Sequence, residues 1–183
     1  MRTHLDIDEK ALQKAERALE TIPGGMELAL MRSYNRALTE GRTAGTRAVR
    51  SHYTLKARDV RETFVMHKAK RSSLEAELMS TGRHLPLSMY AHRPGGDTTG
   101  NKRKAIRVGV KKGGLKPLGQ AFIHQGRIMQ RLGATRLPVE HKYGPAVPLL
   151  VGNDEVSQTI VDTLSNAVDK RLSHETRRLL EKG

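Results

Sequence analysis

The sequence predicts an α+β fold in which long N-terminal and C-terminal helices enclose a central, mostly antiparallel sheet of four or five strands. Apolar residues recur at a spacing of three and four over residues 26–49 and again from residue 154 onward, as they do on one face of a helix. From residue 74 the apolar residues instead alternate with polar ones, which is typical of strands. The chain has 183 residues, so we expect a single domain.

The first expected element is a short helix over residues 8–21, which the sequence Pro23-Gly24-Gly25 ends. Residues 1–25 are therefore predicted to form an N-terminal helical arm. The second helix covers residues 26–49 and would be roughly 37 Å long at a rise of 1.5 Å per residue.

Two glycines, Gly41 and Gly45, lie one turn apart on the apolar face of the second helix. Each costs about 1 kcal/mol of helix propensity relative to alanine, so a close approach by another part of the structure is expected to compensate. That neighbour is either a sheet of the same chain, in a tight helix–sheet contact, or another subunit. The two glycines are therefore also candidates for a subunit interface.

The middle of the chain is predicted to hold one short helix and several short strands. The helix covers residues 57–65, and the strand candidates cover 74–79, 85–92, 103–112, 121–123 and 128–129. Residues 137–151 contain several prolines and are expected to be a loop. A final amphipathic helix of up to about 43 Å begins at residue 154.

Composition narrows the classes of function. The net charge of +14 favours a polyanionic or acidic partner. With two Phe, four Tyr and no Trp, the chain lacks the aromatic platform that reads single-stranded RNA. The absence of cysteine excludes disulfides, cysteine-based zinc sites and thiol nucleophiles. The first ten residues are charged, and no apolar run is long enough to span a membrane, so we expect a protein that is neither exported nor membrane-bound.

No motif in the sequence indicates catalysis. Gly95 and Gly100 have the spacing of a phosphate-binding loop, but Asn101 occupies the position of the required lysine. The eight histidines form no pair with the spacing of a helical zinc site. An enzyme would have to use a carboxylate pair such as Glu75 and Glu77, which is more typical of a solvated strand face. The sequence therefore predicts no enzyme, no cofactor and no metal site.

The strongest local signal is the basic middle of the chain. Residues 93–131 contain ten Lys or Arg residues and one acid, Asp97. We interpret residues 93–118 as a basic hairpin, with Arg103, Arg107 and Lys111 on one strand face, where they could follow phosphates without reading bases. Charge alone leaves two partners open, DNA or an acidic protein surface. The candidate contact residues are Arg93, Lys102, Arg103, Lys104, Arg107, Lys111, Lys112 and Lys116.

Beyond these patterns, the order of several short motifs over residues 26–180 resembles that of the minor tail protein Z family of tailed bacteriophages. The motifs are YTLKARDVR at 53–61, GRHLPL at 82–87, the basic hairpin, QAFI at 120–123, MQR at 129–131, RLPV at 136–139 and YGPAVP at 143–148. The resemblance implies a tail completion protein that acts at the head-proximal end of the tail, with no catalytic residues.

Together, the charge pattern and the resemblance lead to a hypothesis of assembly. Six copies, a number that the resemblance implies, would form a ring for head–tail joining and DNA positioning. Its partners would be the tail terminator, the tail tube or neck proteins, and virion DNA; the protein would lie in the host cytoplasm during assembly and then in the virion. The alternative is a stand-alone basic nucleic-acid-binding protein.

The loop with Tyr143, Pro145 and Pro148 is a second interface candidate, because its prolines limit the entropy lost on docking. The alternative, which we favour, is that the loop serves only to redirect the chain into the last helix.

Overall fold

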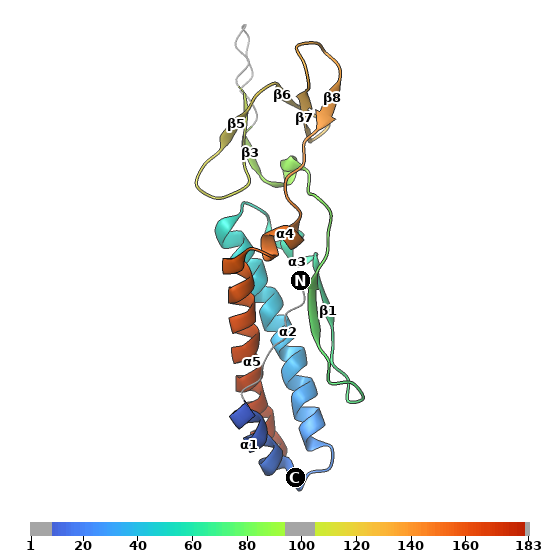
Figure 1. Ribbon diagram of the computed structural model, residues 1–183, viewed down its shortest axis with the longest axis vertical. Helices are drawn as coiled ribbons and strands as arrows, with labels where there is room; N and C mark the ends of the chain where they lie inside the picture. The colour runs from blue at the N-terminus through green and yellow to red at the C-terminus, as the bar shows by residue number, and fades with distance from the viewer. Residues whose placement is uncertain (1–8, 94–104, 182–183) are drawn as a thin grey trace.

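A computed structural model describes residues 9–93 and 105–181. The described chain is elongated, with the three main helices at one end and most of the short strands at the other (Figure 1). The helical part consists of α1 (Glu9–Leu19), α2 (Gly25–His52) and α5 (Asp154–Leu180). The two long helices that the sequence predicts are confirmed. They pack against each other along most of their length, however, and do not enclose a sheet.

The two glycines of α2 permit this close packing. An ideal Cβ at Gly45 would lie 2.8 Å from Phe64 Cζ and 2.9 Å from Ile160 Cδ1. At Gly41, a Cβ would lie 2.8 Å from Leu164 Cγ and would collide with Leu164 Cδ2. Both glycines are buried, and the neighbours that fill the space over them are side chains of α5 and of the first two strands. The close approach is therefore within the chain, and α5 contributes to it as well as the predicted sheet.

At the far end of the helical part, α1 packs across α5 and the beginning of α2. A small separate core forms there from Ala15, Leu19, Ala29, Leu30 and Leu172. Beside it, the largely buried Glu175 of α5 accepts a hydrogen bond of 3.1 Å from the Arg32 guanidinium of α2. The predicted N-terminal helical arm is thus a helix that joins the same packed unit.

The prediction of one central sheet is wrong, because the strands form three small antiparallel sheets. The first pairs β1 (Phe64–His67) with β2 (Glu77–Ser80) and lies along α2. The second has the order β3 (Ala91–Arg93), β4 (Ile106–Gly109), β5 (Lys116–Leu118). The third has the order β6 (Ala121–His124), β7 (Arg127–Arg131), β8 (Val139–His141).

Short turns and prolines account for most of the local differences from prediction. The helix predicted over 57–65 ends early, as α3 (Ala57–Arg61), and Phe64 and Val65 begin β1 instead. The strand predicted over 85–92 is interrupted after Pro86 by a 3-10 turn, η1 (Leu87–Met89), so only its end belongs to a strand of a sheet. The proline-rich loop predicted over 137–151 contains β8 and α4 (Val147–Val151).

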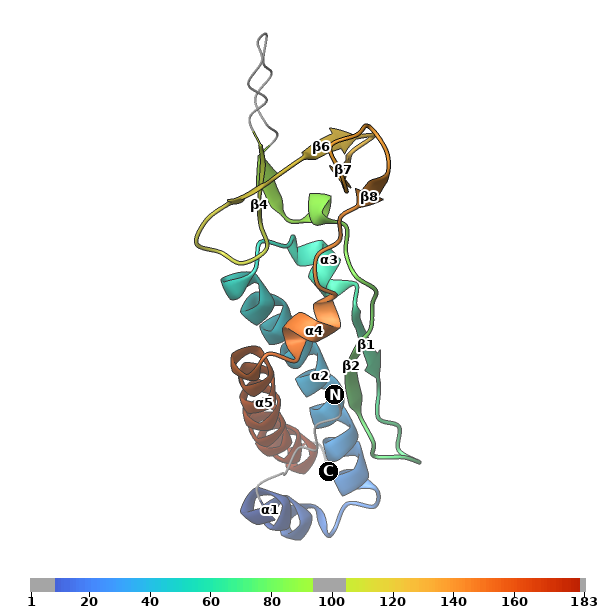
Figure 2. The same cartoon turned by 45° about the horizontal axis from the view of Figure 1, so that its top comes forward.

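The main core lies where the helical part meets the strands. Val49, Val60, Ile128, Val147 and Val156 are fully buried there, and they come from α2, α3, β7, α4 and α5 respectively. Figure 2 shows α3 and α4 between the long helices and the two upper sheets. This joint attaches both upper sheets to one end of the helix pair.

Candidate basic interface

The basic residues that the sequence singles out lie on and beside the β3–β4–β5 sheet. Arg93 of β3 is directly opposite Arg107 of β4, and Arg107 is in turn opposite Pro117 of β5. Directly opposite residues of an antiparallel pair share a face of the sheet. Both arginines are exposed. The structure therefore brings together two cations that are fourteen positions apart in the sequence.

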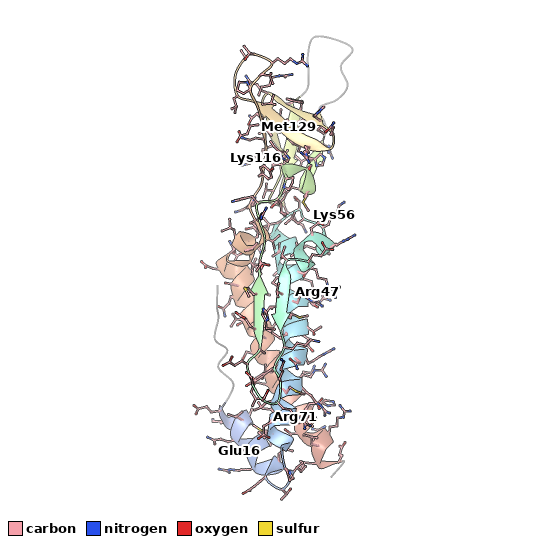
Figure 3. The ribbon with its side chains drawn as sticks, turned by 90° about the vertical axis from the view of Figure 1, so that its right-hand side faces the viewer. Glu16, Arg47, Lys56, Arg71, Lys116 and Met129 are labelled. Atoms are coloured by element: carbon pink, nitrogen blue, oxygen red, sulfur yellow. The ribbon has the colours of Figure 1, made fainter. Side chains whose placement is uncertain are left out.

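The other described lysines of this set lie around the arginine pair. Lys116 is opposite Val108 and so belongs to the other face of the sheet. Lys111 and Lys112 follow β4, which ends at Gly109, so the predicted stripe on a single strand face does not extend to Lys111. Lys102, Arg103 and Lys104 lie outside the described residues. Figure 3 labels Lys116 on this end of the molecule and Glu16 on the opposite end.

Backbone contacts hold the β3–β4–β5 sheet, which we call the basic sheet, on the end of α2. Lys111 forms a bridge with Tyr53, and the Lys112 amide donates a hydrogen bond of 2.8 Å to the His52 carbonyl. Thr54 connects two strands at once, because its hydroxyl donates to the Gly109 carbonyl and accepts from the Ala91 amide at 3.0 Å. This role could not be predicted from the sequence, since the only local signal at Thr54 is the end of the apolar repeat.

The cations of this end are not neutralised by the described part of the chain. Arg93, Arg107, Lys111, Lys112 and Lys116 are all exposed, and none forms an ion pair with a described carboxylate. Residues 105–131 contain no Asp or Glu. A concentrated positive charge of this kind attracts phosphate or carboxylate groups without specifying a sequence.

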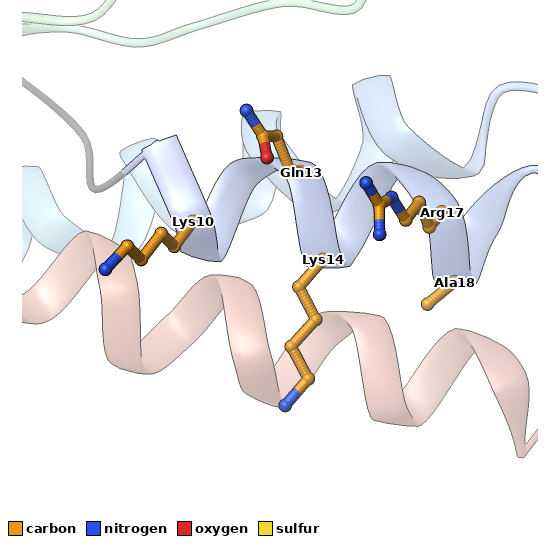
Figure 4. A pocket seen from close by; sticks show the side chains of 5 residues that line it. All are labelled: Lys10, Gln13, Lys14, Arg17 and Ala18. Carbon is orange, nitrogen blue, oxygen red and sulfur yellow. The ribbon is translucent and has the colours of Figure 1, made fainter.

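Elsewhere, two open hollows lie beside the helices. One, of about 450 Å³, is lined by three cations along one face of α1, which are Lys10, Lys14 and Arg17 (Figure 4). Gln13 and Ala18 complete its lining. The other, of about 660 Å³, lies between α2 and α5. Its potential acid and base both have partners: Glu40 forms an ion pair with Arg36 at 3.1 Å, and His52 Nε2 lies 3.4 Å from a carboxylate oxygen of Glu155. Among residues 9–93 and 105–181, no cluster of three or more side chains could hold a metal ion.

Comparison with known families decides how this arrangement is interpreted. A family model described as prophage minor tail protein Z (GPZ) matches residues 9–182. The chain belongs to this family. Minor tail protein Z is a structural, non-enzymatic protein of the phage tail, and the resemblance seen in the sequence is confirmed. No curated protein and no solved structure matches the chain. In the described part of this family member, no helix is long and apolar enough to cross a bilayer.

The second predicted interface of this minor tail protein, at residues 143–148, lies mostly against the core. The Tyr90 hydroxyl donates a hydrogen bond of 2.6 Å to the Pro145 carbonyl, and Gly144 is buried against the Tyr90 ring. Pro148 lies in the first turn of α4. The loop thus leads the chain into α4, while the Tyr143 side chain remains 54% exposed.

Proposed function

We propose that this minor tail protein completes the head-proximal end of the phage tail as a ring subunit, and that its basic interface holds the end of the virion DNA. The proposal rests mainly on the Arg93–Arg107 pair, which lies in a sheet at one end of an elongated helical body. The partner of the basic interface is DNA, because the residues opposite Arg107 on the two neighbouring strands are an arginine and a proline, which offer charge but little apolar area. Phosphates are bound through charge alone, whereas protein interfaces also bury apolar side chains.

A ring is supported by the shape and the charge distribution of the subunit. Cyclic symmetry is the usual way in which identical subunits surround an axis. Six elongated copies packed side by side, with their strand ends in register, would place six arginine pairs around a central passage. That arrangement would join tail to head and keep the DNA end in the passage, and the tail terminator, tail tube and neck proteins would be its neighbours.

The proposal is tested by supplying variants in trans to a phage that lacks the gene. Without the protein, we expect tails that fail to join heads, as counted by electron microscopy. The double variant R93Q/R107Q should enter tails normally but give particles that lose DNA or infect poorly. The control R61Q/R83Q removes two exposed cations outside the basic sheet and should behave as the natural protein does.

Each component of the proposal can fail separately. Complete tails in the absence of the protein would contradict the tail-completion role. Equal infectivity of R93Q/R107Q and R61Q/R83Q would contradict the role of the basic interface. If the protein is absent from tails and the purified monomer binds duplex DNA with a steep loss of affinity between about 50 and 200 mM salt, the stand-alone nucleic-acid-binding alternative is correct.

A further inference from the structure

The β6–β7–β8 sheet meets the main core on one face only, and the core covers that face in part, because Ile123, directly opposite Ile128, is 40% exposed. Ile128 of β7 is fully buried in the main core and marks the inner face. On the other face, Phe122, Met129 and His141 are directly opposite one another across the three strands. All three are partly exposed. We call this face, together with the loop between β7 and β8, the outer sheet face.

Large apolar side chains are exposed around this sheet. Leu132 and Leu137, in the loop between β7 and β8, are 61% and 67% exposed, and Tyr143 just after β8 is 54% exposed. The Tyr143 ring contacts the His141 ring at a centroid distance of 4.4 Å and so extends the row of partly exposed side chains. Single exposed leucines are common on protein surfaces, whereas a contiguous apolar group indicates an interaction site.

Cations surround the apolar side chains. The Arg131 guanidinium lies over the Phe122 ring at 4.9 Å, and Arg127 shares its face of β7. The only acid in residues 121–143 is Glu140, whose carboxylate is 3.0 Å from the Lys142 ammonium group. Aromatic residues, methionine and arginine are the residue types enriched in protein–protein interfaces. The outer sheet face therefore differs in chemistry from the basic interface, which has cations without this apolar area.

We propose that the outer sheet face docks a different tail protein, one whose contact surface has an aliphatic centre surrounded by carboxylates. The inference depends on the proposed function in one respect: the partner is another protein of the assembled tail. DNA fits poorly, because a phosphate backbone would leave the exposed leucines without an apolar partner. A second copy that docked through the same face would bring Arg127 and Arg131 against their own equivalents, which costs binding energy.

The acidic part of α5 in a second copy is also a poor complement to the outer sheet face. The most acidic described stretch is the first part of α5, where Asp154, Glu155, Asp162 and Asp169 occur before the first Lys or Arg. No large apolar side chain is exposed over these residues, since the described ones that are exposed lie at 65, 123, 132, 137, 143, 149 and 180. An acidic surface without an apolar centre would leave Leu132 and Leu137 unburied.

The test is photocrosslinking inside assembled tails. Benzoylphenylalanine is placed at position 137 on the outer sheet face or, as the control, at position 180 on α5, where Leu180 is 48% exposed. We expect position 137, but not position 180, to crosslink to a different tail protein with an acidic surface. A crosslink from position 137 to a second copy, or no crosslink, would overturn the inference. Mass spectrometry of the same tails detects the protein itself, so a failure of the proposed function would be recognised separately.

A pair of substitutions gives an independent measurement. L137D introduces a negative charge where the partner is expected to be acidic. L180D makes the same change at the last residue of α5, at the opposite end of the molecule. Both side chains are exposed, so we expect the two variants to fold and to have equal unfolding temperatures. We expect L137D to lower the yield of tails that contain the protein by about tenfold or more, which corresponds to the loss of one good interface contact. Equal yields from the two variants would contradict the docking surface.

Discussion

Arg93 of β3 lies directly opposite Arg107 of β4, and no described carboxylate pairs with either guanidinium group. Like charges that face each other across two strands lower the stability of a sheet. Since both side chains are exposed, water and salt reduce the repulsion without removing it. A bound anion would turn the same arrangement into a favourable one, so the pair is better suited to an anion-bound state than to the free protein.

Replacement of one arginine by an acid should therefore separate stability from function. R107E would form a cross-strand ion pair with Arg93, and we expect it to raise the free energy of unfolding by about 0.2–1 kcal/mol in urea denaturation at low salt. The same variant should lower DNA retention in particles. R61E removes an exposed cation of α3 as a control and should leave retention unchanged. An R107E phage that retains DNA as well as R61E would show that the pair has no role in binding.

The Thr54 hydroxyl is expected to strengthen the attachment of the basic sheet to the end of α2, beside the backbone contacts. T54V keeps the shape of the side chain but removes the hydroxyl that joins the Gly109 carbonyl to the Ala91 amide. We expect a loss of about 1–3 kcal/mol, because a part-buried acceptor and a backbone donor lose their partner together. Hydrogen exchange should accelerate in β3 and β4 while α5 is unaffected. Uniform acceleration over the whole chain would indicate that the sheet is not a separately attached unit.

The packing of Gly41 beneath Leu164 predicts a change of sign in a double-mutant cycle. G41A alone places a methyl group against the Leu164 side chain and should destabilise by about 1–3 kcal/mol. In the L164A background the two closest contacts are gone and the Leu78 side chain, whose Cδ2 is 3.3 Å from the ideal Cβ, is the neighbour that remains. The same substitution should then cost much less, or stabilise by up to about 1 kcal/mol through helix propensity. Chemical denaturation of the four proteins gives the coupling energy. Additive effects would mean that α5 moves aside without cost.

Tyr90 should make stability depend on alkaline pH. Burial, together with the neighbouring Tyr53, raises the pKa of Tyr90 to about 12 from 10.0, so the folded state retains its proton longer than the unfolded state does. The contribution of protonated Tyr90 to the free energy of unfolding is therefore complete below about pH 10 and is lost as the pH rises toward about 12. At neutral pH, Y90F should cost about 1 kcal/mol by removing the hydrogen bond to the Pro145 carbonyl.

The difference in stability between the natural protein and Y90F should shrink as the pH is raised from about 10 to about 12. Y143F is a suitable comparison, because Tyr143 is 54% exposed and its hydroxyl lies 2.9 Å from His141 Nδ1 on the surface. Urea denaturation at a series of pH values measures both differences. A constant difference between Y90F and the natural protein over this range would show that Tyr90 does not titrate as its burial requires.

The helices could be predicted from the sequence because their signal is local. The apolar period of α2 and α5 extends over 28 and 27 residues, and every turn repeats it. The strands are only three to five residues long, so each carries two or three alternations at most. Such short patterns indicate extended chain, but they do not say which strands pair. The single central sheet was wrong for this reason.

The candidate site shows the same division. Its charge was visible as ten cations against one acid over residues 93–131, whereas the pairing of Arg93 with Arg107 depends on strand register. Likewise, Gly41 and Gly45 could be recognised as sites of close approach, but not Leu164 and Ile160 as the side chains that approach them.

By itself, therefore, the amino-acid sequence determined the two long helices, the concentration of positive charge and the family, because periodicity, composition and motif order are properties of neighbouring residues. Only the tertiary structure decided that α2 packs on α5, that the strands divide into three sheets, and that Thr54 connects the basic sheet to the helices. These contacts join residues far apart in the chain, and they depend on how side chains from several elements fill a shared volume.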